Sequence, residues 1–422
     1  MTNAAEAAVR IGYVMTHYPR HSQTFLFNEV ATVADGATEI VPYSLNPPDP
    51  GDVELPDELS ERDRTFYVKA QSPVRIAMAV LRTARRHPGR FVEALGVAVR
   101  FGGLDARLLA WTLFQLAEAC VLVERVRDDG CRHLHAQFGG PTATVCLLVH
   151  LLDGDADRPI SWSFTVHGYH EFTEEKQIHL PQKVRQASFV SGVSDHTRSQ
   201  LMRISAPEVW ERLHVARCGV DLDAFEFHPP AVRTGDGLRV LSVGRLSPEK
   251  GQHLLVDAAA LLARRGRRDI TMVFVGDGPS RSDLERRAAG LGDQVEFLGA
   301  KDLDEVRAEL GRSDAFCLAS FAEGIPISIM EAFAVGVPVV ATDVGGVSEL
   351  VVDGVTGRLV PPGSADALAD ALERLADDPD GAIEMTKAAR RGVEERHDLT
   401  VTSTAMRALL RAAALDPVSS PD

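Results

Sequence analysis

The stretch Val240–Arg265, VLSVGRLSPEKGQHLLVDAAALLARR, decides the fold class. Its apolar start is followed by a glycine-containing turn, and a helical apolar pattern begins after Gly251. A buried strand that leads through a tight turn into a helix is typical of a parallel sheet covered by helices. The helix N-terminus offers free N–H groups to an anion, and Arg245 and Lys250 would add two charges. The stretch therefore predicts an anion-binding turn in an α/β fold, although both side chains could instead point into water.

The same alternation of short apolar runs and amphipathic stretches continues through the chain, which predicts two doubly wound, Rossmann-like domains facing one cleft. The expected strands are Val9–Met15, Glu39–Leu45, His133–Gln137, Ile160–Val166, Phe189–Val193, Arg239–Val243, Thr271–Val275, Val295–Phe297, Ala315–Leu318, Pro338–Ala341 and Gly357–Val360. Pro229-Pro230 and nearby glycines interrupt regular structure between the halves. We expect an N-terminal domain over 1–222, a C-terminal domain over 223–395, and a helix and tail over 396–422 that pack back on the first domain.

Composition limits the function classes. At ~150 residues per domain, 422 residues predict two or three domains. The 60 acidic residues outnumber the 45 basic ones, which disfavours a general nucleic-acid binder. Five cysteines without close pairs indicate neither a disulfide framework nor a zinc site, and the N-terminal sequence lacks the pattern of a signal peptide. We therefore expect a cytoplasmic protein without a metal.

A second motif, Ser320–Val351, reads SFAEGIPISIMEAFAVGVPVVATDVGGVSELV. If a helix begins at Pro326, its rise of ~1.5 Å per residue separates the carboxylates of Glu323 and Glu331 by on the order of 10 Å. A carboxylate pair for retaining glycoside hydrolysis needs ~5 Å, so the two acids would hold separate parts of a ligand. Glu331 is suited to accept hydrogen bonds from ribose hydroxyls. The alternative is that both acids only support an ordinary helix.

Together with VGDGP at Val275–Pro279, FLGA at Phe297–Ala300 and the GRLSPEKG segment, this motif resembles the GT-B retaining glycosyltransferases of family GT4. The segments FTVHGYHEF and ARCGVDLDAF in the first half resemble the colanic-acid and exopolysaccharide branch of that family. The resemblance implies that the C-terminal domain binds a nucleotide sugar and the N-terminal domain binds the acceptor. It also implies transfer with retained anomeric configuration and without a metal or other cofactor.

The resemblance assigns roles to individual residues. Glu323 would contact the donor sugar, Glu331 the ribose, and Arg245 and Lys250 the diphosphate, whose charge grows in the transition state. His167 follows an apolar strand and would act with Glu323 at the reacting centre. The expected donor-binding residues are Gly244, Arg245, Lys250, Gly276, Leu298, Gly299, Gly324, Ile325, Pro326 and Glu331. The nucleotide is expected to be UDP, with GDP and dTDP open.

The acceptor side is marked less clearly. Polar residues near expected strand ends provide its candidates, although half of such residues only satisfy local backbone groups. The candidates are Ser22, Thr24, Asn28, His135, Gln137 and Glu171. This chain departs from related sequences at His170, where an acidic residue is common, and at Gln23, which replaces another acid. Contacts to sugar or acceptor at these two positions are therefore open.

Two further patterns need separate interpretation. Asp153–Asp157, DGDAD, contains the D-x-D pattern of metal-dependent GT-A enzymes but lies in a polar turn, which favours a solvated loop. Lys69–Arg107 carries eight basic residues against Glu93 and Asp105 and reads as helical. This segment could rest on anionic lipid or form an arginine-rich face in water. Sparse aromatic residues argue against nucleic acid as its partner.

The sequence thus predicts a retaining glycosyltransferase that modifies a hydroxyl acceptor in exopolysaccharide or cell-surface glycan biosynthesis. A lipid-linked glycan is the leading acceptor, and the enzyme could be peripheral on the inner face of the plasma membrane. Glycosylation of a soluble natural product is one alternative. A sugar-nucleotide 2-epimerase or a non-catalytic sugar-nucleotide-binding protein is another, from a different class. The sugar, linkage and oligomeric state do not follow from the sequence.

Overall fold

The computed structural model describes residues 8–20, 24–49, 53, 55–154, 159–173, 178–228 and 237–415. The chain divides into two compact units. Unit 1 comprises Met1–Arg217 and Thr402–Asp422, and unit 2 comprises Cys218–Val401. The division at Cys218 lies slightly before the expected boundary near residue 223, because the segment after it already bonds within unit 2. Val220 N, for example, donates to the carbonyl of His397 at 2.9 Å.

Unit 1 contains a seven-stranded parallel sheet in the order β3-β2-β1-β4-β5-β6-β7. The order reverses between β1 and β4, which is where open α/β sheets bind ligands at the carboxyl ends of their strands. The strands are β1 Val9–His17, β2 Thr38–Asn46, β3 Phe66–Tyr67, β4 His133–Gln137, β5 Ser161–Val166, β6 Phe189–Gly192 and β7 Leu213–Val215. β3 and β7 were not expected from the sequence, since runs of two and three residues carry no readable periodicity.

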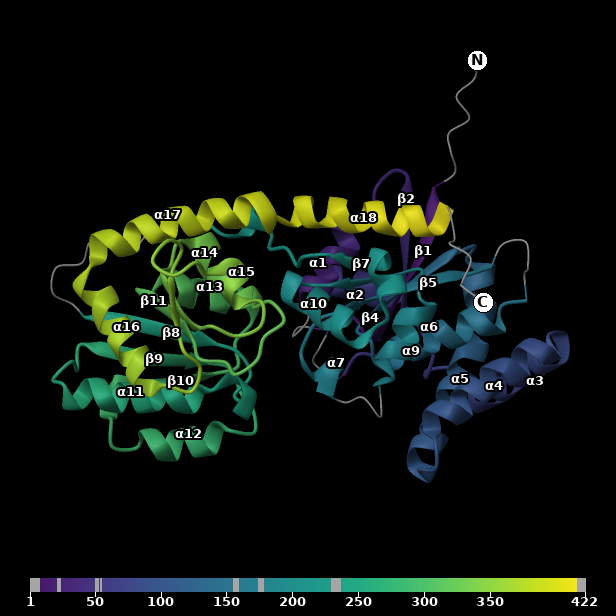
Figure 1. The fold of residues 1–422 in the computed structure, drawn as a ribbon, viewed down its shortest axis with the longest axis horizontal. Helices are drawn as coiled ribbons and strands as arrows, with labels where there is room; N and C mark the ends of the chain where they lie inside the picture. The colour runs from purple at the N-terminus through teal and green to yellow at the C-terminus, as the bar shows by residue number, and fades with distance from the viewer. Residues whose placement is uncertain are drawn as a thin grey trace, which may run out of the picture. The chain divides into compact units, whose positions relative to one another are not determined.

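Helices cover both faces of this sheet (Figure 1). Side chains alternate along β1, so Ile11 and Tyr13 join the core under α1 and α18, while Val14 joins the core under α5 and α6. The helices are α1 Thr24–Val33, α2 Pro56–Arg64, α3 Pro73–Arg86, α4 Pro88–Gly102, α5 Ala106–Asp128, α6 Pro141–Leu152, α7 His170–Thr173, α9 Leu180–Gln186, α10 Asp195–Ile204, the 3-10 helix η2 Pro207–Arg212, and α18 Leu399–Leu415.

The last helix, α18, belongs to unit 1 along most of its length. The Thr32 and Ser403 hydroxyls lie 2.5 Å apart, and Arg407 and Arg411 donate to the carbonyls of Val33 and Ala37, each at 2.7 Å. The sequence predicted a helix over Thr400–Ala413, close to the observed bounds. α18 thereby covers one face of the sheet in unit 1.

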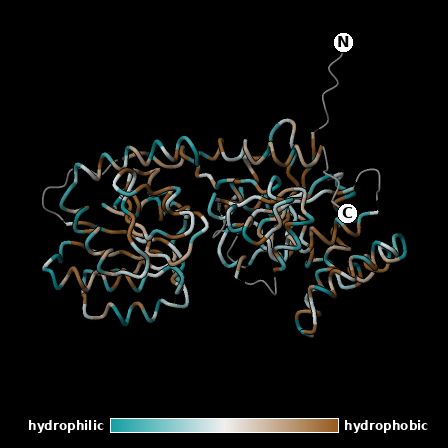
Figure 2. The backbone as a smooth tube through the Cα atoms, in the orientation of Figure 1, coloured by the Kyte–Doolittle hydropathy of each residue, from teal (hydrophilic) through white to brown (hydrophobic). Residues whose placement is uncertain are grey.

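Unit 2 contains a six-stranded parallel sheet in the order β10-β9-β8-β11-β12-β13, which reverses between β8 and β11. Its strands are mainly hydrophobic, as are those of unit 1 (Figure 2). The strands are β8 Leu238–Val243, β9 Ile270–Val275, β10 Val295–Gly299, β11 Ala315–Leu318, β12 Val339–Thr342 and β13 Arg358–Val360. The helices are η3 Leu222–Ala224, η4 Pro248–Lys250, α11 Gln252–Arg264, α12 Arg281–Ala288, η5 Gly292–Gln294, α13 Leu303–Gly311, α14 Ile327–Val335, α15 Val347–Leu350, α16 Ala365–Asp377 and α17 Pro379–Arg396.

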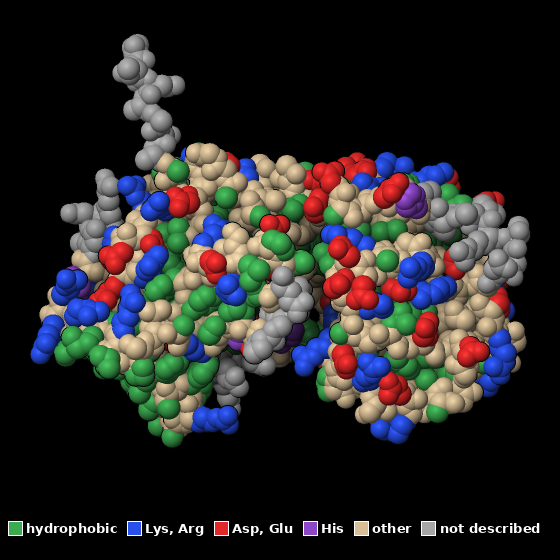
Figure 3. All heavy atoms as spheres, turned by 180° about the vertical axis from the view of Figure 1, so that it is seen from behind, with side chains coloured by type: hydrophobic (Ala, Val, Ile, Leu, Met, Phe, Trp, Pro, Cys, Tyr) green, Lys and Arg blue, Asp and Glu red, His purple; other side chains and the backbone are tan. Residues whose placement is uncertain are grey.

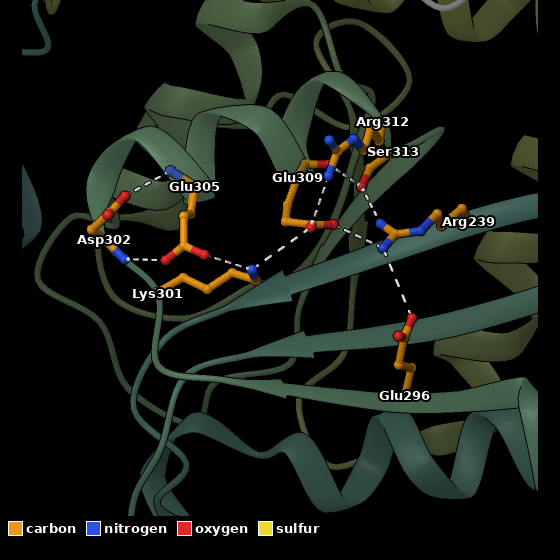
Figure 4. A network of polar contacts seen from close by, with 8 residues as sticks. All are labelled: Arg239, Glu296, Lys301, Asp302, Glu305, Glu309, Arg312 and Ser313. Carbon is orange, nitrogen blue, oxygen red and sulfur yellow. Dashed lines mark hydrogen bonds and ion pairs between the residues drawn. The ribbon is translucent and has the colours of Figure 1, made fainter.

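A polar network holds α13 against this sheet (Figure 4). The buried carboxylate of Glu309 accepts from Arg239 of β8 at 2.8 Å and from Arg312 at 3.3 Å. Asp302 caps the helix, accepting from Glu305 N at 2.8 Å, while the Glu305 side chain accepts from Asp302 N at 3.1 Å. The network fixes the position of α13, whose Arg307 influences the site described below.

Among the described residues, one helix, α5, is long and apolar enough by length and composition to cross a membrane. Half of its most apolar window is buried within the protein. Leu116, Cys120 and Leu122 of this helix lie in the core of unit 1. α5 therefore packs as a core helix along that part of its length.

Candidate functional site

The loops at the carboxyl ends of the strands in unit 2 are bonded to one another. Gly244 N, after β8, donates to the carbonyl of Val275 at 2.9 Å, and Gly276 N, after β9, donates to that of Gly299 at 2.7 Å. Phe321 N, after β11, donates to the carbonyl of Glu249 at 2.8 Å. These loops thus form one connected edge around the point where strand order reverses.

Glycines allow close approaches of the backbone at this edge. A Cβ on Gly251 would lie 2.1 Å from the carbonyl oxygen of Ala319, and one on Gly345 would lie 1.9 Å from that of Glu323. Both glycines also have positive φ, +64° and +54°, which side-chain-bearing residues rarely adopt. Only glycine lets these loops meet without displacement.

Lys250 and Glu323 form the centre of this edge. Lys250 Nζ donates to Glu323 Oε1 at 2.6 Å, and Ser320 Oγ donates to the same oxygen at 2.6 Å. The Glu323 side chain is only 9% exposed, whereas that of Lys250 is 29% exposed. One cation and one carboxylate, 73 residues apart in sequence, are thus juxtaposed where the fold binds ligands.

Arg245 lies on the same loop as Lys250. Its side chain is exposed and has no hydrogen bond or ion pair with any residue that the structure describes. Arg245 interacts with Glu249 electrostatically but without a hydrogen bond or close ion pair, so it can meet an anionic ligand without first breaking such a contact.

Glu331 lies half-buried on α14, which begins at Ile327, one residue later than expected, with Pro326 in the N-cap position. Burial raises the pKa of Glu331 to about 7, and the positive charge of Arg307 partly offsets that rise. Arg307 itself stacks over the Phe225 ring at 5.0 Å. Sequence reasoning missed Arg307, because nothing in its local pattern connects α13 to Glu331.

The other expected donor residues lie on the same loops or strand ends. Gly324, Ile325 and Pro326 are buried between Glu323 and α14. Leu298 and Gly299 end β10, and Gly299 has a φ of +78°. The structure therefore brings all of the expected donor-side residues to the carboxyl edge of one sheet.

In unit 1, His167 follows β5 and lies against two aromatic rings, Phe138 at 4.5 Å and Phe25 at 5.2 Å between centroids. Its Nε2 is 2.7 Å from Gln137 Oε1. Gln137 Nε2 donates to Glu29 Oε1 at 2.9 Å, so its amide oxygen faces the imidazole as an acceptor. Nε2 of His167 must then carry the proton, which leaves Nδ1 as an acceptor. Burial lowers the pKa of His167 to about 3, so the ring is neutral.

Glu29 ends this polar chain inside unit 1. It accepts from the Tyr13 hydroxyl at 3.0 Å as well as from Gln137. Burial raises the pKa of Glu29 to about 7, although both hydrogen bonds oppose the shift. The sequence did not single out Glu29, because its helical position resembles that of any core-facing residue.

Glu171 occupies a different place from the acceptor-side position expected of it. Its carboxylate is buried and accepts from three backbone N–H groups, those of Gly139 at 2.5 Å, His167 at 2.7 Å and Gly168 at 3.2 Å. Lys183, fully buried nearby, donates to the carbonyls of Gly139 and Gly140 at 2.7 and 2.8 Å. Glu171 therefore joins the loops after β4 and β5 and positions the backbone of His167.

His135 is likewise a core residue rather than a group at a ligand surface. Its Nδ1 lies 2.7 Å from Ser163 Oγ and its Nε2 lies 2.9 Å from Thr165 Oγ1, so both ring nitrogens are occupied. His133 makes the same kind of bridge between Ser161 and Ser163. Burial lowers the pKa of both histidines, so they cross-link β4 and β5 in neutral form.

The remaining residues that the sequence suggested for the acceptor side or for a metal have less defined surroundings. Thr24 and Asn28 lie on the first turns of α1, and Ser22 lies outside the described residues. In the D-x-D segment, Asp153 is buried, accepts from Ile160 N at 2.7 Å and forms an ion pair with Arg127. Asp155 and Asp157 lie outside the described residues. Across the described part of the chain, no group of His, Cys, Asp or Glu side chains could hold a metal ion.

Comparison with known proteins gives this geometry a context. Residues 224–392 match the family model for glycosyl transferases group 1. The chain is 28% identical over 423 residues to a protein of Escherichia coli (strain K12) named as a colanic acid biosynthesis glycosyltransferase, WcaL, covering 96% of this chain and 100% of WcaL. It is 36% identical over 242 residues to the alpha-D-kanosaminyltransferase of Streptomyces kanamyceticus, covering 55% of this chain and 62% of that protein.

The fold also matches a solved structure. HepE of Anabaena in complex with UDP-glucose superimposes with a TM-score of 0.69 and 19% sequence identity, covering 96% of this chain and 99% of HepE. At this identity the likeness concerns the fold.

Proposed function

We propose that this chain, whose residues 224–392 match the group 1 glycosyltransferases and whose fold is GT-B, is a glycosyltransferase of that group that transfers a sugar with retained configuration to a hydroxyl of a cell-surface polysaccharide or its lipid-linked precursor. The donor is a nucleotide sugar. The near full-length similarity to WcaL supports a role in exopolysaccharide biosynthesis. Because the HepE structure holds UDP-glucose, a UDP-sugar is the first donor to test.

The contact between Lys250 and Glu323 is the observation that carries the proposal. When the bond between sugar and diphosphate breaks, negative charge grows on the leaving oxygens, and a fixed cation stabilises it. Lys250 is pre-positioned by Glu323 and remains partly exposed toward a ligand. Glu323, with Ser320 as a second partner, has further lone pairs with which to accept hydrogen bonds from sugar hydroxyls.

His167 supplies the second part of the proposed mechanism. Since Gln137 holds the proton on Nε2, Nδ1 can accept a hydrogen bond from a hydroxyl of the donor sugar. A neutral ring in this tautomer can stabilise positive charge developing on the sugar without adding charge of its own.

The name of the kanosaminyltransferase bears on the sugar transferred and not on the acceptor. That relative is named for transfer of an amino sugar and is the more similar of the two in local identity. A soluble natural product as acceptor would use the same donor side. The two candidates therefore differ only in what unit 1 binds.

A calorimetric melting panel with UDP-, GDP-, dTDP- and ADP-sugars tests the donor assignment. A ligand that binds the folded state at about 100 times its Kd adds ~2.7 kcal/mol of stability, so one nucleotide class should raise the transition temperature clearly. Heat capacity is the appropriate signal, because all three tryptophans, Trp111, Trp162 and Trp210, lie in unit 1 and would not report on unit 2. If none of these nucleotide sugars raised the transition temperature at millimolar concentration, that result would contradict the proposal.

Donor affinity is expected to depend on the ionisation of Glu331. An ionised carboxylate can accept from both ribose hydroxyls, so affinity should rise as pH increases through the Glu331 pKa of about 7. Only about a tenth of the group is ionised one pH unit below its pKa, so the Kd should fall up to ~10-fold between about pH 6 and pH 8. Titration calorimetry should use a nucleotide sugar, whose esterified diphosphate does not itself titrate there.

Glu331→Gln is the matched control for this pH dependence. The amide keeps the size of the side chain but cannot ionise, so binding should be weaker and nearly independent of pH. If the donor Kd of the Glu331→Gln variant changed with pH as steeply as that of the wild-type protein, another group would be responsible for the pH dependence.

A further inference from the structure

The end of unit 1 formed by α3, α4 and the start of α5 exposes an unusual amount of hydrophobic surface. Figure 3 shows hydrophobic side chains gathered there, with Lys and Arg side chains at the margins. In Figure 2 the same helices alternate between hydrophobic and hydrophilic residues. The large exposed hydrophobic side chains of this region are Val74, Met78, Leu81, Val92, Val99, Leu104, Trp111, Leu113 and Phe114.

On α3 these side chains form a continuous stripe. Val74, Met78 and Leu81 follow helical spacing and are exposed, whereas Ala79 and Thr83 on the opposite side are buried against unit 1. Val74 is 74% exposed. The helix therefore has two apolar faces, of which only one is used by the core. Contiguous exposed apolar surface of this kind usually marks a docking site.

The stripe is accompanied by unpaired positive charge. Arg82 is engaged with Glu124 at 2.7 Å, but five other arginines of this region are exposed and have no ion-pair partner among the described residues. They are Arg85, Arg86, Arg90, Arg100 and Arg107. Of the two acids within Lys69–Arg107, Asp105 caps α5 and interacts electrostatically with Arg107, and Glu93 is the other, so positive charge exceeds negative charge on this segment.

We propose that this end of unit 1, the α3–α5 surface, docks on an anionic lipid bilayer. Apolar side chains would enter the headgroup boundary while the surrounding arginines meet lipid phosphates, the arrangement of interfacial helices. A second copy of the chain is a poorer partner. A two-fold contact would place the same arginine-rich patch against itself, and like charges would face each other.

The α3–α5 surface continues toward the carboxyl edge of the sheet in unit 1. Lys69 donates to Asn46 at the end of β2 at 2.9 Å, and its Nζ lies 5.2 Å from the Trp111 ring centroid and 5.6 Å from that of Phe114. The α4–α5 end also points to the same side of unit 1 as α7 (Figure 1). Docking would thus present the acceptor side to the membrane, a consequence that rests on the proposed lipid-linked acceptor. The docking itself does not depend on it.

Co-sedimentation with vesicles tests docking without any activity measurement. The full chain should pellet with phosphatidylcholine vesicles that contain about a third phosphatidylglycerol and remain in solution with phosphatidylcholine alone. Val92→Asp/Leu104→Asp and, separately, Arg85→Glu/Arg86→Glu should each lower the partition coefficient on the order of tenfold or more, as should 0.5 M NaCl.

Matched variants on unit 2 give the comparison. Val355→Asp changes another exposed valine, and Arg264→Glu/Arg268→Glu reverses two other exposed charges, so both should bind vesicles like the wild-type protein. An equal loss of vesicle binding in these control variants would show a general effect of charge and would overturn the proposal. So would an absence of binding to anionic vesicles, or a dimer in solution that the Val92→Asp/Leu104→Asp variant dissociates. Nucleotide-sugar binding should persist in all variants, which separates failure of docking from failure of the proposed function.

Discussion

Lys250→Met is expected to lower kcat by ~10²–10³-fold, the usual effect of removing one fixed group that stabilises a developing anion. The substitution removes the positive charge that lies 2.6 Å from Glu323 and leaves that carboxylate with Ser320 as its remaining hydrogen-bond partner. The loss should appear in initial rates at saturating donor and acceptor. Because the Glu323 side chain is only 9% exposed, the loss of its cationic partner should also lower the melting temperature.

Arg264→Met is the control for charge alone. Arg264 lies on α11, the helix that follows Lys250, and is exposed. Its removal should leave kcat unchanged, while Lys250→Arg, which keeps the charge with different geometry, should retain part of the rate. A Lys250→Met enzyme within about threefold of wild-type kcat would remove Lys250 from the reacting centre.

Glu171→Ala is expected to cost unit 1 about 3–5 kcal/mol of unfolding free energy. The substitution leaves three N–H groups, those of Gly139, His167 and Gly168, without their acceptor, and removes the carboxylate whose charge favours protonated Lys183. Burial already lowers the pKa of Lys183 to about 7, so losing this favourable interaction should lower it further. Denaturant unfolding followed by tryptophan fluorescence measures this selectively, since every tryptophan lies in unit 1.

Glu208→Ala provides the comparison for this measurement. Glu208 is exposed in η2 of the same unit, and its removal should change stability by less than about 0.5 kcal/mol. Glu171→Gln should fall between the two, because an amide oxygen can replace only one of the two accepting oxygens. Unfolding of Glu171→Ala at the wild-type midpoint would mean that the loops after β4 and β5 do not need this carboxylate.

Most of the architecture could be predicted from the order of residues. Buried parallel strands are short, continuous apolar runs between helices, so β4 and β11 were located without error and most others within one or two residues. The glycine turn before α11 pointed to Lys250 because that turn directly follows a recognisable strand, whereas Glu323 received its role from the family resemblance of the motif before α14. β3 and β7 were not predicted, because two or three residues are too few to show an alternating hydrophobic pattern.

The sequence by itself determined the fold class and the local position of each donor-side residue, because these depend on patterns within one strand–turn–helix step. Only the tertiary structure decided which polar groups satisfy one another. It paired Lys250 with Glu323, placed Arg307 near Glu331, and showed His135 and Glu171 to be buried partners of strands and backbone. A residue's own neighbours in sequence set the face on which it lies. Whether that face meets solvent, a ligand or another element depends on long-range packing, which no local spacing records.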